Sequence, residues 1–187
     1  MPVSAERLLV LGDSLSDAYQ MPSEAGWVSL LQQRLGDDFT VINASISGET
    51  TAGGMHRIET LLKRHEPDFV LIELGGNDGL RGLSPRQLEQ NLEAIITRVL
   101  AADAMPILMQ IRLPGNLGPV YLERFEAVYP ALAKRHEIAL VSFFLDGIFD
   151  QPGMMMADGI HPTIEAQPLM LERLWPELKP ILDLSEG

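Results

Sequence analysis

Two segments far apart in the chain carry residue types that could together perform nucleophilic catalysis. Ser14 ends a Gly-Asp-Ser motif, and Asp158 and His161 stand three residues apart near the other end of the chain. A serine hydroxyl becomes a useful nucleophile when a base lies beside it. A carboxylate three residues before a histidine can reach the ring Nδ1–H, fix the tautomer and leave Nε2 to accept the serine proton. Because Pro162 disfavours helical geometry at His161, we expect that histidine on an extended or turning segment.

Each of these segments also has a plainer interpretation. Ser14 or Asp13 could simply cap a helix that follows a strand, which is a common role for serine and aspartate. We expect Ser14 where the strand turns into a helix, so that its backbone N–H lies at the helix N-terminus, where negative charge is favoured. Asp158 could likewise cap a turn in which His161 takes no part. The residue types alone therefore leave a catalytic and a structural role open for both segments.

Gly48 and Asn77 could supply hydrogen bonds to a developing negative charge. Acyl transfer needs two or three donors aimed at the oxyanion of the tetrahedral intermediate. Gly48 can present a backbone N–H with no side chain in the way, and Asn77 can present its side-chain amide. Taken singly, a glycine and an asparagine are more often ordinary turn residues. Their place in the fold decides between these roles.

Apolar runs alternate with amphipathic stretches along the chain. The runs predict strands at residues 8–11, 39–42, 69–74, 107–111 and 138–144, and the amphipathic stretches predict helices at 27–35, 55–65, 84–102 and 120–135 and from about 163 onward. This alternation predicts an α/β fold, a three-layer α/β/α sandwich around a five-stranded parallel sheet. In such a sheet, ligands bind at the carboxyl ends of the strands. Since all the residues named above follow predicted strands, we expect them to meet at one edge.

Length, charge and cysteine content exclude several classes of protein. The chain has 187 residues, which predicts a single domain over residues 1–187. Its formal charge of -12, from 26 acidic and 14 basic residues, would repel a nucleic-acid backbone, and a polybasic membrane anchor is absent. The absence of cysteine excludes disulfides, thiolate zinc sites and a cysteine nucleophile. No apolar run approaches the roughly 20 residues of a membrane helix. The N-terminus does not resemble a secretory signal, so we expect either a cytoplasmic protein or a periplasmic one whose signal has been removed.

In their order along the chain, the motifs resemble those of the bacterial GDSL-type, or SGNH, hydrolases. The family pattern is Gly-Asp-Ser, then a glycine, then Gly-x-Asn-Asp, then Asp-x-x-His, and the chain carries all four in that order. The longer strings LGDSLS, NASISGET, ELGGNDGLRG, MQIRLP and DGIHP are similar to those of the thioesterase, lysophospholipase and arylesterase branch. The resemblance extends from about Leu8 to the last predicted helix.

The resemblance implies a flavodoxin-like SGNH hydrolase fold and a role for each motif residue. Ser14 would be the nucleophile, His161 the base and Asp158 the residue that orients the base. The Ser14 N–H, the Gly48 N–H and the Asn77 amide would form the oxyanion hole. The resemblance also implies a small acyl ester or thioester as substrate, with neither a metal nor an organic cofactor. Many members of this branch are exported to the periplasm.

Small and apolar residues near the motifs predict where the acyl group lies. Gly76 belongs to a glycine-rich segment around Asn77, which favours a loop that can move. We expect the substrate-binding residues to be Gly76, Leu80, Leu113, Pro114 and Ile160. The methionines at 154–156 could add a compliant apolar wall or merely pack a loop. The other histidines follow no strand, so we expect a surface position for His56, His65 and His136.

Three other functions fit parts of the sequence. A flavodoxin-like binding domain would suit the predicted sheet, but the segment Ser47–Thr50 that could hold a phosphate follows the second strand rather than the first. A phosphatase using Asp13 would want a further carboxylate for magnesium, and the next one is Asp17. A carbohydrate acetylesterase of the same fold keeps the mechanism and changes the substrate. The apolar residues Leu113 and Pro114 favour a longer acyl group.

Overall fold

A sheet of five parallel strands forms the centre of the molecule. The computed structural model describes residues 5–183, and its strands are β1 (Glu6–Gly12), β2 (Phe39–Asn43), β3 (Phe69–Glu73), β4 (Met105–Met109) and β5 (Ala139–Val141). They are hydrogen-bonded in the order β2-β1-β3-β4-β5, and every neighbouring pair is parallel. The predicted α/β fold is confirmed. The strand order reverses at β1, and this is the place where open parallel sheets bind their ligands.

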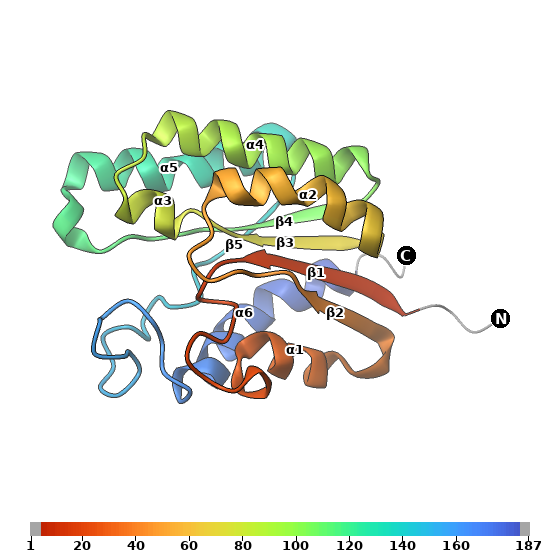
Figure 1. Cartoon of the computed structure of the whole chain (residues 1–187), viewed down its shortest axis with the longest axis horizontal. Coiled ribbons are helices and arrows are strands. Elements are labelled where there is room, and N and C mark those ends of the chain that lie inside the picture. Colours follow the sequence, from red (N-terminus) through yellow and green to blue (C-terminus); the bar gives the residue numbers. More distant parts are fainter. Residues whose placement is uncertain (1–4, 184–187) are drawn as a thin grey trace.

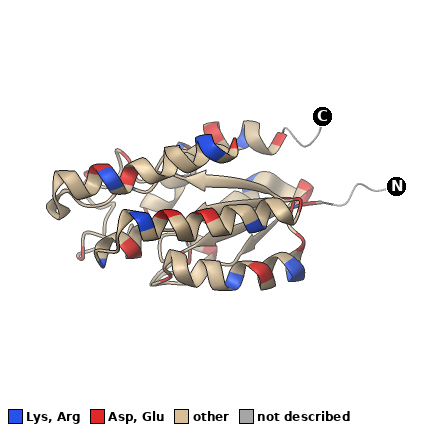
Figure 2. Cartoon of the chain, turned by 90° about the horizontal axis from the view of Figure 1, so that it is seen from above, with Lys and Arg blue, Asp and Glu red and all other residues tan. Residues whose placement is uncertain are grey.

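Helices cover both faces of the sheet (Figure 1). α1 (Trp27–Leu35) and α6 (Ala166–Leu182) lie on one face, and α2 (Thr51–His65), α4 (Pro85–Ala101) and α5 (Pro119–His136) lie on the other. The short α3 (Gly76–Leu80) and three 3₁₀ turns, η1 (Ser23–Ala25), η2 (Gly36–Asp38) and η3 (Gly115–Leu117), lie in the connections. Most of the charged positions fall on the helices rather than on the strands, as Figure 2 shows. Most of the charged residues therefore lie on the helices that surround the sheet.

The strands are apolar along their length because both of their faces are covered. In β1 the residues Leu8, Leu9, Val10 and Leu11 are all 0% exposed, and β3 is buried throughout. A strand with one wet face would instead alternate apolar and polar residues. Fully burying one such leucine contributes about 2 kcal/mol. The two strands that lead to the site are therefore stabilised by burial on both of their faces.

Some element boundaries differ from those predicted. α2 begins at Thr51 rather than at Met55, with the Thr50 hydroxyl capping it by accepting the Gly53 N–H at 3.3 Å. Two adjacent glycines obscured this first turn in the sequence pattern. A Cβ at Gly54 would lie 2.5 Å from a methyl of Leu74, so glycine is what lets α2 approach the sheet. The predicted cap of α4 is confirmed, since the Ser84 side chain accepts the Gln87 N–H.

The last two strands are also displaced from their predicted ranges. β4 begins two residues earlier than expected, at Met105, and β5 ends at Val141 rather than at residue 144. β5 is an edge strand that pairs only with β4, so its apolar continuation, Phe143 to Leu145, packs into the core as a turn. Apolar composition alone cannot distinguish these two forms of burial.

The segment between β5 and α6, residues 142–165, lies at the edge where the strands have their carboxyl ends (Figure 1). It is folded upon itself rather than extended. Met155 and Pro162 form an isolated antiparallel bridge, and the Met156 N–H donates to the His161 carbonyl at 2.7 Å. The Thr163 hydroxyl donates to the Gly153 carbonyl at 2.8 Å. These bonds fix the backbone on both sides of His161.

Within residues 5–183, no helix has the length and apolarity that crossing a membrane requires.

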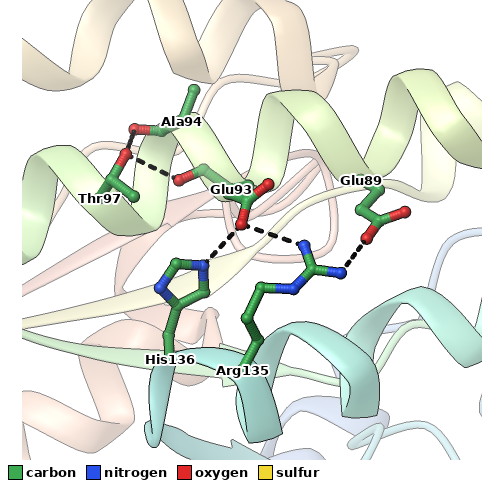
Figure 3. A network of polar contacts seen from close by, with 6 residues as sticks. All are labelled: Glu89, Glu93, Ala94, Thr97, Arg135 and His136. Atoms are coloured by element: carbon green, nitrogen blue, oxygen red, sulfur yellow. Dashed lines mark hydrogen bonds and ion pairs between the residues drawn. The ribbon is translucent and has the colours of Figure 1, made fainter.

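A polar network joins α4 to α5 away from this edge (Figure 3). Arg135 donates to Glu89 at 2.7 Å and to Glu93 at 3.0 Å, and the His136 Nε2 lies 2.9 Å from the same Glu93 oxygen. The His136 side chain is only 16% exposed, so the expectation of a simple surface position is wrong for this histidine. Its partner lies on another helix, and the sequence spacing could not show that contact.

Candidate active site

Ser14 lies just beyond the carboxyl end of β1, in a turn. The Asp13 carbonyl accepts the Asp17 N–H at 3.0 Å, which closes one helix-like turn. No helix follows it, so the expectation that Ser14 stands at a helix N-terminus is wrong. Ala18 (φ 52°) and Gln20 (φ 53°) adopt left-handed backbone conformations that stop the turn from continuing as a helix. A helix dipole therefore does not assist Ser14.

Asp158 uses its two oxygens for two different tasks. Oδ1 accepts the backbone N–H groups of Ile160 (2.9 Å) and His161 (3.0 Å), which caps the turn. Oδ2 lies 2.6 Å from Nδ1 of the His161 ring. The hydrogen bond from the ring, followed by the two from the backbone, lowers the pKa of Asp158 to about 2. Asp158 thus caps the turn and also contacts the ring, so the interpretation in which His161 takes no part is wrong. The carboxylate stays ionised at physiological pH.

The other nitrogen of His161 meets the serine. Its Nε2 lies 2.9 Å from Ser14 Oγ, across 147 residues of sequence. Carboxylate, imidazole and hydroxyl therefore form an unbroken chain of two hydrogen bonds. The His161 side chain is 17% exposed, so its ring is largely shielded from water. With Nδ1–H donating to Asp158, the neutral ring presents Nε2 as the acceptor for the serine proton.

Two of the three expected oxyanion donors have no acceptor of their own. The backbone N–H groups of Ser14 and Gly48 donate to no residue that the structure describes. Gly48 has φ 82°, a conformation that glycine adopts without strain. The Asn77 amide donates to the Glu49 carbonyl at 2.9 Å and to the Asp13 carboxylate at 3.3 Å. Asn77 therefore bridges the loop that carries Gly48 and the turn that carries Ser14.

Asp78, the residue after Asn77, ties α3 to the start of α2. Its carboxylate is fully buried and accepts the Thr51 N–H at 2.9 Å and also the Thr51 hydroxyl. Asn91 on α4 donates to that hydroxyl at 3.0 Å. A carboxylate at a helix N-terminus is electrostatically favourable. Asp78 therefore holds the Gly48 loop and Asn77 in one frame, a role that the sequence analysis did not assign.

The loop after β2 has a second restraint, from a partly buried ion pair. Arg57 on α2 donates through Nε to the Glu49 carboxylate at 2.7 Å and through a terminal nitrogen to the Ala44 carbonyl at 2.9 Å. The Glu49 side chain is only 11% exposed. Because Glu49 also receives the Asn77 amide through its carbonyl, this ion pair positions Asn77 from the side of the loop.

Two carboxyl groups are buried beneath the serine. Asp13 is 2% exposed and Glu73, the last residue of β3, is fully buried. One Glu73 oxygen accepts the Ser16 hydroxyl at 2.7 Å and the Asp13 N–H at 3.3 Å, and the other has no partner among the described residues. Burial raises the pKa of Asp13 to about 6, and burial together with the nearby Asp13 charge raises the pKa of Glu73 well above 4.5. The sequence signal for this pair was a glutamate that ends an otherwise apolar run.

The expected substrate-binding residues are spread around the site with different degrees of exposure. Leu80 and Ile160 are both 41% exposed, and Pro114 is exposed. Gly76 begins α3, so its segment is a helical turn rather than the expected loop. A Cβ at Gly79 would lie 2.3 Å from Leu113, so this glycine serves close packing rather than motion.

A hollow of about 470 Å³ lies farther along the Leu113 loop. Its lining comes from one end of α5 and the residues before it, together with the start of α4: Pro85, Leu117, Gly118, Pro119, Val120, Tyr121 and Arg124. None of the five predicted substrate-binding residues lines this hollow. Val120 is 62% exposed, and such an exposed apolar side chain in an amphipathic helix was the available sequence signal.

The carboxylates considered for a magnesium site are engaged elsewhere. The Asp17 side chain accepts both the N–H and the hydroxyl of Ser47, at 2.9 and 2.7 Å, and Asp13 is buried against Glu73. Across residues 5–183, no three histidine, aspartate or glutamate side chains cluster as metal ligands would. Asp17, the carboxylate considered as the partner of Asp13, is therefore already bound to the loop after β2.

The fold and this hydrogen-bonded chain at the strand edge together define a class of protein, the serine hydrolases on a flavodoxin-like α/β/α sandwich. The chain belongs to the GDSL-like lipase/acylhydrolase family, whose model matches residues 10–167. The resemblance inferred from the motifs is confirmed, and the family places the chain among the carboxylic ester hydrolases.

Named relatives cover almost the whole chain. It is 52% identical over 182 residues to Esterase TesA of Pseudomonas aeruginosa, covering 96% of this chain and 90% of that one. It is 48% identical over 180 residues to the Thioesterase 1/protease 1/lysophospholipase L1 of Escherichia coli K12, covering 96% and 86%. An Arylesterase of Vibrio mimicus is 49% identical over 178 residues, covering 94% and 89%.

Solved structures agree with this fold. The crystal structure of TesA superposes with a TM-score of 0.90 at 52% identity, covering 94% of this chain and 99% of that one. The psychrotrophic esterase EstA from Pseudoalteromonas sp., in a structure inhibited by monoethylphosphonate, superposes with a TM-score of 0.92 at 40% identity, covering 95% and 99%.

Proposed function

We propose that this chain, as a single catalytic domain, hydrolyses carboxylic esters and thioesters through an acyl-enzyme on Ser14. The observation that carries the proposal is the pair of hydrogen bonds from Asp158 through His161 to Ser14, at 2.6 and 2.9 Å. A nucleophile, a base within hydrogen-bond reach and a third group that orients the base form the arrangement that activates a serine.

Acylation begins when Ser14 Oγ attacks the substrate carbonyl carbon. His161 Nε2 takes the hydroxyl proton, and the imidazolium is stabilised by the Asp158 carboxylate, which does not itself accept the proton. The carbonyl oxygen becomes an oxyanion that the free N–H groups of Ser14 and Gly48 can bind. The Asn77 amide joins them when the N–H that makes its longer contact, to Asp13 at 3.3 Å, turns to the oxyanion instead. The intermediate then collapses, the bond to the leaving oxygen or sulfur breaks, and His161 returns the proton to the leaving group.

Deacylation repeats these steps with water in place of the serine hydroxyl. His161 removes a proton from the water as it attacks the acyl carbon, and the same donors bind the second oxyanion. Collapse releases the carboxylic acid, and the proton on His161 returns to Ser14 Oγ. Because Asp158 remains ionised throughout, the same tautomer of His161 is restored at the end of each cycle.

The breadth of substrate is supported by the relatives and by the surface near the site. Proteins about half identical to this chain are named an esterase, a thioesterase and lysophospholipase, and an arylesterase. Exposed Leu80 and Ile160 offer apolar surface near Asn77 and His161, which suits an acyl chain. A carbohydrate acetylesterase is the second candidate, since the same residues would serve acetyl groups without using this surface.

A panel of p-nitrophenyl esters and acyl-CoA thioesters of graded chain length tests the proposal, with Ser14→Ala as the blank. Each buried methylene contributes at most about 0.8 kcal/mol, so several added carbons should raise kcat/KM by roughly tens-fold until the apolar surface is covered. Both oxyesters and thioesters should be cleaved. A steady fall in kcat/KM from acetyl onward would select the acetylesterase instead.

A further inference from the structure

The ring of Tyr19 lies flat against the ring of His161. The two centroids are 4.0 Å apart and the planes are inclined by 23°. Both nitrogen edges of the histidine are already occupied, by Asp158 on one side and Ser14 on the other. Tyr19 therefore covers one of the two faces of the imidazole, which the contacts at the nitrogens leave open. Neither the motif pattern nor the proposed roles include this tyrosine.

The backbone on either side of Tyr19 is held in a conformation that its residues seldom adopt. Ala18 and Gln20 have φ values of 52° and 53°, in the left-handed region, although neither is a glycine. Such strain persists where surrounding structure over-determines it, and it concentrates at functional sites. The restraints are visible here. The Met21 N–H donates to the Ala18 carbonyl at 3.1 Å, and the Gln20 amide donates to the Tyr19 hydroxyl at 3.0 Å.

The close packing of Gly26 supports the same conformation. A Cβ at Gly26 would lie 3.0 Å from the Ala18 Cβ, so the turn is pressed against the residue that precedes α1. On the other side, the Trp27 indole N–H donates to the Leu15 carbonyl at 3.1 Å. The turn that carries Tyr19 is therefore fixed at both ends. The stacking on His161 is a property of a braced segment rather than of a free surface side chain.

We propose that Tyr19 is a positioning residue for the base, which holds the His161 ring in line and stabilises its protonated form through the face of the phenol ring. This inference rests on the proposed function, in which the proton of Ser14 moves to His161 Nε2 as the oxyanion forms. The ring is neutral before this step and cationic after it. An aromatic face attracts a cation within about 6 Å of its centroid, and a neutral ring gains no such charge term. The contact therefore strengthens in the transition state, which is the condition for raising kcat.

The charged and titratable groups around His161 come from three segments. Asp158 touches Nδ1, Tyr19 covers one face, and Asp13 lies near enough for the His161 charge to act on its pKa. Burial raises the pKa of Asp13 to about 6, so this group titrates within the range of the activity profile. Since Asp13 and Asp158 are the same in all Tyr19 variants, a difference between the profiles reports on Tyr19.

The test compares Tyr19→Phe with Tyr19→Leu and Tyr19→Met in the full chain, using one p-nitrophenyl ester from pH 5 to 9. Phenylalanine keeps the ring face and should stay within about twofold of the native kcat. Leucine and methionine lose it, and kcat should fall by roughly 2–5-fold. Because the imidazolium is then less stable, the midpoint of the acid limb should move to lower pH by about 0.4–0.7. A purely structural role would lower the plateau without moving this midpoint.

Two results would overturn the inference. One is an unchanged midpoint in both Tyr19→Leu and Tyr19→Met, with folding confirmed by thermal melting. The other is a Tyr19→Phe variant as impaired as the aliphatic ones, which would assign the effect to the hydroxyl. Failure of the proposed function is recognised separately, because Ser14→Ala would then keep its ester hydrolysis whatever the Tyr19 variants do.

Discussion

Replacing Glu73 with glutamine should stabilise the protein at neutral pH and leave its stability near pH 4 almost unchanged. Glu73 is fully buried, and one of its oxygens has no partner among the described residues. Burial and the Asp13 charge raise its pKa well above 4.5. Glutamine resembles the protonated carboxyl in shape and charge. Its carbonyl oxygen can take the place that accepts the Ser16 hydroxyl and the Asp13 N–H.

The sign and size of the effect follow from proton linkage. An acid with a raised folded-state pKa contributes full stability below its unfolded pKa, and this stability is lost as pH rises through the folded pKa. Above about pH 5.5 the unfolded chain has released the Glu73 proton, while the native chain retains it up to its own raised pKa. Each proton of difference lowers the free energy of unfolding by about 1.4 kcal/mol per pH unit. The variant lacks this term, so its advantage should grow by up to about 1.4 kcal/mol per pH unit until the native chain also releases the proton.

The assay is denaturant unfolding of the native chain and Glu73→Gln at pH 4, 5.5, 6.5 and 7.5. Glu165→Gln is the matched control, since it makes the same chemical change at an exposed position before α6. The free energy of unfolding of the control should change with pH in the same way as that of the native chain. The reasoning is refuted if the free energy of unfolding of Glu73→Gln also follows that of the native chain at every pH. Glu73 would then bind no extra proton in the folded state.

Three further outcomes test the site and the helix layer. Asn77→Ala should lower kcat by about 10²–10³-fold with little change in KM, because an oxyanion donor acts mainly in the transition state. Steady-state kinetics will show this, and a change confined to KM would argue against that role. Asp158→Asn should keep its thermal melting temperature but lose up to about 10⁴-fold in kcat, since the amide favours the wrong tautomer of His161. A loss in kcat below tenfold would contradict the role of Asp158 in orienting His161. Hydrogen bonds from His136 and Arg135 lower the pKa of Glu93. Their stabilisation is present above pH 4.5 and is lost as pH falls through the lowered value. Glu93→Gln should therefore cost less than about 1 kcal/mol at pH 7 and progressively less as pH falls below 4.5, as denaturant unfolding will show.

The sheet and the meeting of the motif residues could be predicted from the sequence because each rests on a local pattern. Continuous apolar runs such as Leu8 to Leu11 can be satisfied only by burial on both faces, and parallel strands bring their carboxyl ends to one edge. The alternation of strands and helices along the chain therefore predicts the edge at which Ser14 and His161 meet. Their contact at 2.9 Å required the structure.

The remaining features depend on contacts that have no local signature. The turn at Ser14 was mistaken for a helix start because the left-handed residues that end it, Ala18 and Gln20, are not glycines. The pairing of Asp13 with Glu73 joins residues 60 apart, so only the structure could show two carboxyls sharing one buried space. Tyr19 belongs to none of the sequence motifs, and only the structure shows its stacking on His161. The hollow at Val120 arises where the start of α4 meets the start of α5 and the residues before it.

Covalent labelling of Ser14 tests the central claim most directly. The chain is reacted with an organophosphonate and analysed by intact-mass and peptide mass spectrometry, with Ser14→Ala in parallel. The hydrogen bonds that link Asp158, His161 and Ser14 predict one adduct per chain, located on Ser14, together with loss of ester hydrolysis, and neither an adduct nor hydrolysis in Ser14→Ala. An adduct on another residue, or full hydrolysis by Ser14→Ala, would contradict the account.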